Sequence, residues 1–234
     1  MNKKQMIFRW LCGAIFLWGG VTQAGIIVGG TRVVYDGGKR EASLSVNNPD
    51  KHPYLIQAWS DADGATGEKK GGDKPPFVVT PPLFRLDPGS ENMVRIIRTG
   101  GVLPEDRESV YWMNVKSIPA SAKSDRNVLQ ISVKTRIKLF YRPAGIKAPT
   151  DEDYRQLTFR RAGNQLQVTN PTPYYITFYS LRMGSVPVTT TNVMVPPRGT
   201  ATYPLPAAAR AGQVSWQAIN DFGGNNKTVT ITLQ

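Results

Sequence analysis

The segment Asn127–Pro143 has the most regular hydrophobic pattern in the sequence. Its apolar residues Leu129, Ile131 and Val133 alternate with polar ones. A period of two residues is typical of a β-strand that buries one face. The pattern continues for longer than the usual strand of about five to six residues, and it ends at Pro143, which has no N–H to donate to a sheet. It predicts a long strand, part of which is free to pair with a partner.

Residues 1–24 have the pattern of a secretory signal peptide. Three basic residues lie at the start, an apolar stretch covers Trp10–Val21, and small residues precede Gly25. The apolar stretch is too short for a membrane-spanning helix, which needs about 20 residues. An uncleaved anchor is the alternative. We expect an exported mature chain that begins near Gly25 and has no membrane span.

The chain has one cysteine, Cys12, and it lies in this leader. The mature chain is therefore expected to contain no disulfide, thiol nucleophile or cysteine-based metal site. The formal charge is strongly basic, at +12 for the whole chain. Such a charge suits nucleic acid, an anionic membrane or an acidic protein partner. Export argues against nucleic acid, and basic residues scattered along strand-like segments favour a protein or carboxylate partner.

Short strand-like segments separated by Gly and Pro fill the chain up to Pro143, and none has helical periodicity. Gly29–Gly30 predicts a bulge or a switch between sheets. A hairpin is expected around Pro88–Gly89. The longer stretch Leu103–Pro119 has apolar residues on both faces. About seven such strands predict an immunoglobulin-like β-sandwich over residues 25–143.

The composition changes after Pro143. The stretch Ala144–Asp153 is rich in Pro, Gly and charge, which is typical of a linker, and a second series of strand-like segments follows. Seven strands are expected, at Leu157–Phe159, Gln165–Thr169, Tyr174–Leu181, Val193–Val195, Thr200–Tyr203, Val214–Ile219 and Thr228–Leu233. They predict a second, smaller immunoglobulin-like sandwich over residues 144–234 and an all-β chain.

The residues give little support to catalysis. His52 is the only histidine, and no GxSxG motif surrounds a serine. One histidine supplies too few ligands for zinc. The acidic residues lie mostly in predicted loops and turns, as do Asp61, Asp63 and Asp87. We expect a protein that is not an enzyme and needs no cofactor or metal, and a hydrolase with paired carboxylates is the weakest alternative.

Three sets of residues remain for a binding function. The first is the alternating apolar set described above. The second consists of two cations, Arg32 and Lys138, on the first and last strands of the first domain. The third consists of the charged residues Glu108, Arg142 and Asp221. Taken alone, these sets have ordinary explanations as a core face, two solvated cations and unrelated surface charges.

Six blocks of sequence, in order along the chain, resemble the periplasmic pilus-assembly chaperones of the chaperone–usher pathway. They are Thr31–Arg32, Thr80–Gly89, Leu103–Ala120, Thr135–Pro143, Asn170–Tyr175 and Ile219–Gly224. The blocks span essentially the whole mature chain, so the resemblance is specific. It implies two immunoglobulin-like domains set as an L or boomerang, with a cleft between them.

Chaperones of that family lend the last strand of their first domain to a pilin subunit whose own fold lacks a strand. They then deliver the subunit to an outer-membrane usher. The resemblance makes Leu129, Ile131 and Val133 the donated side chains, and full burial of each would contribute ~1.5–3 kcal/mol. It implies a periplasmic chaperone whose partners are pilin subunits and an usher.

The same resemblance assigns roles to the charged residues. Arg32 and Lys138 match the pair that binds the C-terminal carboxylate of the subunit through charge-assisted hydrogen bonds. Glu108, Arg142 and Asp221 match a network between the two domains. That network would set the angle of the cleft.

The numbering of the predicted strand raises a geometric question. Leu129, Ile131 and Val133 have odd numbers and Lys138 an even one, so on a flat strand they face opposite sides. Twist, or a bulge near Thr135, would be needed to bring them to the same side.

Two further points concern the stretch Ala120–Arg126 and the exposed strand, and a third is the alternative function. The stretch is short and resembles the short-loop branch of the family, which is associated with rod-like adhesive pili. An apolar edge can also be covered by self-association of the free protein, and the sequence leaves open whether this occurs. The alternative function is a secreted immunoglobulin-like binding module or adhesin that recognises glycan or protein through its loops.

Overall fold

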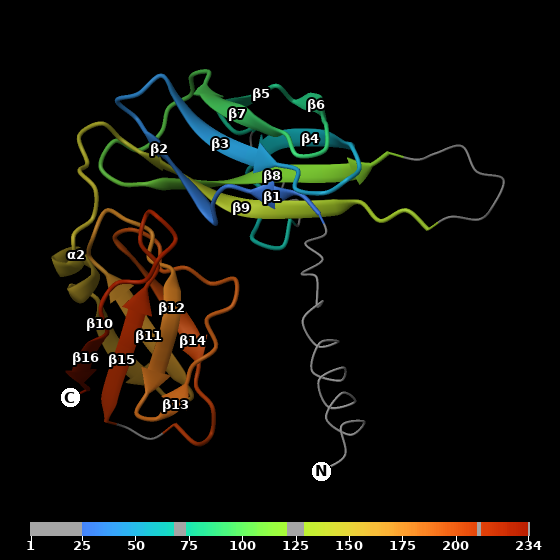
Figure 1. Cartoon of the computed structure of the whole chain (residues 1–234). Coiled ribbons are helices and arrows are strands. Elements are labelled where there is room, and N and C mark those ends of the chain that lie inside the picture. Colours follow the sequence, from blue (N-terminus) through green and yellow to red (C-terminus); the bar gives the residue numbers. More distant parts are fainter. Residues whose placement is uncertain (1–24, 68–73, 121–128, 210–211, 234) are drawn as a thin grey trace, which may run out of the picture.

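The computed structural model describes residues 25–67, 74–120, 129–209 and 212–233. The predicted signal peptide and Cys12 lie outside these residues, as do Asn127 and most of the stretch Ala120–Arg126. The described chain forms two β-sandwiches and one short helix (Figure 1). The prediction of an all-β chain with two immunoglobulin-like domains is confirmed.

The first domain consists of two sheets that pack face to face. One sheet has the strand order β1 (Ile27–Val28), β3 (Glu41–Asn47), β7 (Glu91–Arg98) and β5 (Phe77–Thr80). The other has the order β2 (Arg32–Asp36), β9 (Val133–Arg142), β8 (Ser109–Pro119), β4 (Tyr54–Asp61) and β6 (Leu83–Leu86). Neighbouring strands are antiparallel, except that β2 and β9 are parallel.

The chain switches between the two sheets at Gly29–Gly30. β1 pairs with β3, whereas β2 pairs with β9 in the other sheet. Glycine suits the crossing, because a Cβ on Gly29 would lie 2.1 Å from the Ser45 Oγ and 3.2 Å from the Ser45 Cβ, so Ser45 would have to shift. The switch places Arg32 at the edge of the second sheet, directly beside β9.

The predicted hairpin around Pro88–Gly89 is wrong. β6 pairs with β4, whereas β7 pairs with β3 and β5, so the turn crosses from one sheet to the other. The buried side chain of Asn48 holds this crossing, because its Nδ2 donates to the carbonyl oxygens of Leu86 and Asp87. The turn signal was correct, but it does not say which sheet each strand joins.

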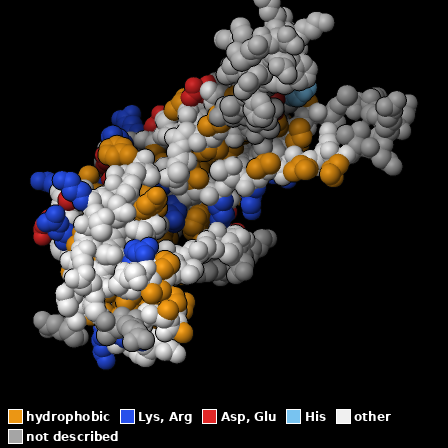
Figure 2. Space-filling model, turned by 60° about the horizontal axis from the view of Figure 1, so that its bottom comes forward, with side chains coloured by type: hydrophobic (Ala, Val, Ile, Leu, Met, Phe, Trp, Pro, Cys, Tyr) orange, Lys and Arg blue, Asp and Glu red, His pale blue; other side chains and the backbone are white. Residues whose placement is uncertain are grey.

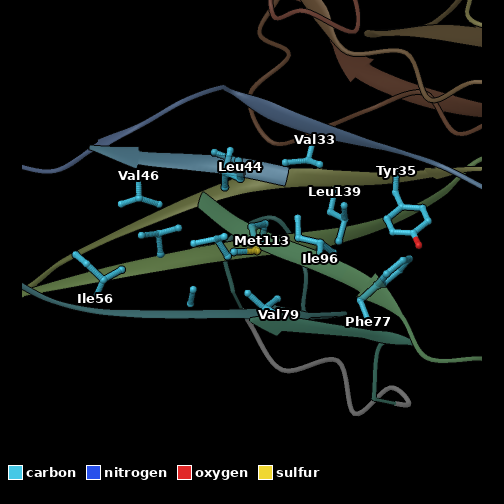
Figure 3. Close-up of a cluster of buried hydrophobic side chains, with 14 of the residues drawn as sticks. Val33, Tyr35, Leu44, Val46, Ile56, Phe77, Val79, Ile96, Met113 and Leu139 are labelled. Atoms are coloured by element: carbon cyan, nitrogen blue, oxygen red, sulfur yellow. The ribbon is translucent and has the colours of Figure 1, made fainter. Parts of the chain in front are cut away.

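Large apolar side chains from both sheets fill the space between them (Figure 3). Leu44 and Val46 of β3 point inward, as the alternation of that strand predicts. Met113 of β8 and Leu139 of β9 meet them from the opposite sheet and are fully buried. These contacts fix the face of β9 that carries the odd-numbered residues against the core.

β9 is a regular strand. It pairs with β8 in one unbroken register from Val133 to Tyr141, so no bulge occurs near Thr135. Odd-numbered residues from Ile137 onward are buried in the core. Even-numbered residues therefore point away from the core, and Lys138 faces the side opposite to Val133.

β9 is shorter than predicted, because it begins at Val133 rather than at Asn127. Leu129 and Ile131 precede the strand and belong to no ladder. The ladder with β8 ends at Ser117, which lies opposite Val133, although β8 itself continues to Pro119. Pro119 has no N–H to donate to a ladder, and among the described residues no other strand pairs with positions 129–131.

The second domain is a smaller sandwich. One sheet has the order β10 (Thr158–Ala162), β11 (Gln165–Asn170) and β14 (Gly199–Pro204). The other has the order β13 (Val186–Pro187), β12 (Phe178–Met183), β15 (Gln213–Ala218) and β16 (Val229–Thr232). Trp216 and Tyr203 lie fully buried between the sheets. The predicted strand Val193–Val195 is wrong, because Val195 forms only an isolated bridge with Ile176.

The segment between the domains contains the helix α2 (Asp151–Arg155), which the sequence pattern did not predict. The N–H and hydroxyl of Thr150 both donate to the carboxylate of Asp153 and hold the first turn. Tyr154 of this helix is buried in the core of the second domain. The predicted domain boundary after Pro143 falls at the start of this segment.

The second domain lies beneath one end of the first (Figure 1). The long ribbon formed by β8 and β9 projects past it. Figure 2 shows a hollow between the two domains, with lysine and arginine side chains inside it. The arrangement gives the chain the predicted L shape.

We expect Leu139→Ala to destabilise the first domain by about 2–5 kcal/mol, because it leaves a cavity at a fully buried position. Urea unfolding followed by tryptophan fluorescence measures the change. Leu129→Ala is the matched control: Leu129 is 86% exposed, so its loss should change the free energy of unfolding by less than about 0.5 kcal/mol. Similar losses in both variants would contradict these placements.

Candidate functional site

One edge of β9 is open over part of its length. β9 pairs with β8 from Val133 to Tyr141, whereas β2 covers its other edge only from Lys138 to Arg142. Among the described residues, the main chain of residues 133–137 therefore has no neighbour on that edge. The unpaired N–H and C=O groups of such an edge are a template for another strand.

Exposed apolar side chains continue the line of this edge. Leu129, Ile131 and Val133 are 86%, 67% and 55% exposed. They belong to neither hydrophobic core, so the ordinary explanation as a core face does not apply. Figure 2 shows orange hydrophobic side chains along this border of the first domain. The structure thus presents an open main-chain edge and a line of apolar side chains together.

The even-numbered residues of β9 form part of what we call the cleft face, the side of the β2–β9–β8–β4–β6 sheet that points away from the core. The second domain contacts this face directly. The rings of Phe140 and Tyr175 lie 5.9 Å apart. The cleft face carries both Lys138 and Arg142, four residues apart on one strand.

Arg32 and Lys138 lie side by side on the cleft face. They are direct partners in the parallel register of β2 and β9. The Arg32 guanidinium donates one hydrogen bond to the carbonyl oxygen of Ile219 at 3.1 Å and lies 5.5 Å above the Phe140 ring. Its buried Nε has no hydrogen-bond partner. Arg32 is therefore held in place, and both cations are partly buried.

Burial makes these cations unusual electrostatically. No acid in the described residues lies within ion-pair distance of either side chain. Burial, with a smaller effect from the charge of Arg32, lowers the pKa of Lys138 to about 8. Burial also lowers the pKa of Arg32. A site of this kind favours an anion that can bind both cations.

Arg142 joins the two domains through charged hydrogen bonds. Its Nε and Nη2 donate to Glu108 Oε1 at 2.9 and 2.7 Å. Its Nη1 and Nη2 donate to the two carboxylate oxygens of Asp221 at 2.7 and 2.8 Å. Although burial opposes it, these carboxylates raise the pKa of Arg142. The structure thus brings together Glu108, Arg142 and Asp221, which lie far apart in sequence.

Two tyrosines add to this junction and were not identified from the sequence. The N–H of Tyr175 donates to Glu108 Oε2 at 2.8 Å, and the Arg142 guanidinium lies 5.4 Å above the Tyr174 ring. Both tyrosines precede β12, in the Asn170–Tyr175 block. The run of two aromatic residues after a rigid Pro-rich turn was the available signal, but their contact with the first domain needed coordinates.

A third arginine of the cleft face, Arg136, was also missed. Arg136 donates to both carboxylate oxygens of Asp61 at 2.7 Å and to Asn114 Oδ1 at 2.8 Å. Its guanidinium lies 4.8 Å above the ring of Trp112. Only the strand register could have revealed this cluster, because Asp61 reads as a loop residue in the sequence.

In the part of the chain that the structure describes, no three His, Cys, Asp or Glu side chains gather into a group able to hold a metal. The same residues contain no helix with the length and hydrophobicity to cross a membrane.

Family models match both sandwiches. Residues 25–147 match the pili and flagellar-assembly chaperones, PapD N-terminal domain, and residues 152–230 match the pili assembly chaperone PapD, C-terminal domain. The chain belongs to the pilus-assembly chaperone family. The family resemblance expected from the six sequence blocks is confirmed.

Individual pilus-assembly chaperones resemble the chain over most of its length. The probable fimbrial chaperone LpfB of Escherichia coli O157:H7 is 45% identical over 221 residues, which cover 93% of this chain and 92% of that protein. The chaperone protein FimC of Escherichia coli strain K12 is 42% identical over 219 residues, which cover 92% and 87%. The chain is also similar to a solved structure of the Salmonella enterica SafA pilin in complex with the SafB chaperone. The TM-score is 0.80 at 34% identity, and the match covers 89% of this chain and 96% of that chain.

We expect Asp221→Asn to loosen the junction between the domains, because Arg142 loses one of its two carboxylate partners. A hydrogen bond to a charged group contributes about 1.5–3 kcal/mol. Small-angle X-ray scattering should therefore show a wider range of interdomain angles. Asp106→Asn is the matched control, since Asp106 pairs with Arg198 in an exposed contact of 3.6 Å, which contributes about 0–1 kcal/mol. Wild-type scattering from the Asp221 variant would contradict the expectation.

Proposed function

We propose that the chain is a periplasmic chaperone that binds, folds and caps pilin subunits by donor-strand complementation and delivers them to an outer-membrane usher. The observation that carries the proposal is the open edge of β9 with its continuation of exposed apolar side chains. A sandwich that lacks one strand needs both features, because pairing supplies main-chain hydrogen bonds and alternating side chains fill its groove. The leader at residues 1–24 supports export to the periplasm.

Similarity to named chaperones supports the same proposal. The relatives described above are named as fimbrial chaperones, and SafB was solved in complex with the SafA pilin. A chaperone acts by binding and requires no catalytic centre. We therefore include in the proposal that the chain is not an enzyme, that it has no cofactor, and that its domains divide at residues 25–143 and 144–234.

Leu129, Ile131 and Val133 are proposed as the donated side chains. They are exposed in the free chain, so their transfer into a subunit removes apolar surface from water without disturbing the chaperone core. Each would contribute ~1.5–3 kcal/mol on full burial. Leu129 and Ile131 precede β9, so the incoming subunit would lengthen that strand by pairing with it. In the absence of a subunit, a second copy of the chain would cover the same edge.

Arg32 and Lys138 are proposed to bind the C-terminal carboxylate of the subunit. Their unpaired charges lie where the open edge of β9 ends and β2 begins. A strand that pairs along this edge lies in the plane of the sheet, so the end of that strand can turn toward either face. Its side chains can therefore follow Val133 on one face while its terminal carboxylate turns to Lys138 on the other. Edge pairing is therefore compatible with Val133 and Lys138 lying on opposite faces of β9.

Glu108, Arg142 and Asp221 are proposed to hold the second domain at the angle that leaves the cleft open. Arg142 lies on the same strand as the anchor lysine. The position of the second domain is therefore tied to the strand that would receive the subunit.

Ile131→Asp should abolish subunit binding, because it would place a charge in an apolar groove. The subunit is first identified by mass spectrometry of proteins that co-purify from periplasmic extract, and it is then co-expressed with each variant. Val78→Asp is the matched control, since Val78 is 49% exposed on the other sheet. A glycan-binding adhesin would instead retain its ligand in Ile131→Asp, and an undiminished subunit complex would overturn the proposal.

Subunit affinity should fall as the pH rises through about 8, because Lys138 then loses the charge that attracts the carboxylate. The charged form of Lys138 dominates below that pH, so a decrease of about tenfold is expected between about pH 7 and about pH 9.5. Isothermal titration calorimetry measures it. Lys138→Arg should remove the pH dependence, because arginine stays charged. An equal decrease in that variant would contradict the anchor assignment.

A further inference from the structure

Residues on the cleft face form rows, because directly paired residues of neighbouring strands point to the same side. One row runs across four strands and consists of Asp61, Trp112, Lys138 and Arg32. Asp61 and Lys138 are thus two strands apart on one face, which corresponds to about 10 Å between their Cα atoms. The row contains an acid close enough to compete for the anchor lysine.

Three acids near the anchor pair, Asp61, Glu108 and Asp221, are each bound by another arginine. Arg136 and Arg142, on the same face of β9 as Lys138, hold these acids. Arg142 binds Glu108 and Asp221, and Arg136 binds Asp61. The two arginines flank Lys138 along the strand. Their effect is to leave the lysine and Arg32 without an internal counter-ion among the described residues.

The contact between Arg136 and Asp61 is well formed. Both partners are largely buried, with side-chain exposures of 9% and 18%. Besides its two bonds to the carboxylate, the guanidinium donates to the carbonyl oxygens of Asp63 and Gly64 at 2.8 Å. Although burial opposes it, the hydrogen bonds and charge of Arg136 lower the pKa of Asp61. The carboxylate is therefore ionised and fully engaged at neutral pH.

We propose that Arg136 is a positioning residue for the carboxylate anchor: by holding Asp61, it keeps Lys138 available for the carboxylate of a bound polypeptide. This inference rests on the proposed function, in which Lys138 and Arg32 bind that group. Without Arg136, the Asp61 carboxylate becomes a competing internal anion on the same face. The lysine side chain is long enough to extend over Trp112 toward it.

Arginine suits this task better than lysine. Its planar fork makes two parallel bonds to one carboxylate and still has donors for the carbonyl groups of the loop. A lysine at this position would neutralise Asp61 without fixing its direction. Of the other charged or titratable groups near the anchor pair, Arg32 acts on the pKa of Lys138, and Tyr154, Asp221 and Glu108 act on the pKa of Arg32. None of them changes in the experiment below.

The direct test is an NMR titration of the Lys138 side chain in the wild type, Arg136→Met and the double variant Arg136→Met/Asp61→Asn. Arg136→Met should raise the pKa of Lys138 by about one unit, because an unpaired carboxylate in a partly buried site attracts the proton. The double variant should return to within about 0.3 units of the wild type, because the free acid is gone. Both variants lose the same guanidinium, so the comparison isolates the charge of Asp61.

Binding gives a second readout. The probe is a synthetic peptide of alternating valine and threonine with a free C-terminal carboxylate, compared with the same peptide as a C-terminal amide. Arg136→Met should reduce the preference for the carboxylate about fivefold, and the double variant should restore it. A purely structural role of Arg136 predicts equal losses for both peptides in both variants. That result, or an unchanged pKa of Lys138 in Arg136→Met, would overturn the inference.

The two proposals fail in different ways. If the wild type shows no preference for the carboxylate, the anchor role of Lys138 fails, whatever Arg136 does. If the preference exists but is unaffected by Arg136→Met, only the role of Arg136 fails. Should Arg136→Met unfold, Arg136→Gln takes its place in both measurements, with Arg136→Gln/Asp61→Asn as the double variant. An unchanged pKa of Lys138 in Arg136→Gln would then overturn the inference.

Discussion

The structure depends on one limit to strand pairing: β9 has a neighbour on both edges for only half of its length. β2 begins at Arg32, opposite Lys138, and leaves residues 133–137 open. The starting point of β2 is set by the sheet switch at Gly29–Gly30, which commits the preceding residues to the other sheet. The length of the open edge is therefore decided at Gly29–Gly30, far in sequence from β9 itself.

The cations of the cleft face fall into two groups, those with an acidic partner and those without one. Arg136 and Arg142 bind Asp61, Glu108 and Asp221, whereas Arg32 and Lys138 have no acidic partner among the described residues. Burial of an unpaired charge costs free energy, and the lowered pKa of Lys138 reflects this cost. A bound carboxylate relieves it. The free protein thus keeps an unfavourable arrangement that only an anionic ligand improves.

One strand, β9, carries one member of each residue set of the proposed site, in order along the chain. Val133 begins the open edge, Lys138 supplies the anchor, and Arg142 binds the second domain through Asp221. The unbroken register of β9 with β8 makes this strand a rigid unit. The angle between the domains and the direction of the donor edge are therefore linked through the main chain.

The sequence by itself determined the two all-β domains, an irregularity at Gly29–Gly30 that is either a bulge or a sheet switch, and the inward face of Leu44 and Val46. Its family resemblance also singled out Arg32, Lys138 and the three charges at the domain junction. The true start of β9, the crossing at Pro88–Gly89 and the contact of Arg136 with Asp61 were decided only by the tertiary structure. The physical reason is that a period of two records which face of a strand is buried. It does not record which strand lies beside it, and that neighbour determines where pairing stops and which charges meet.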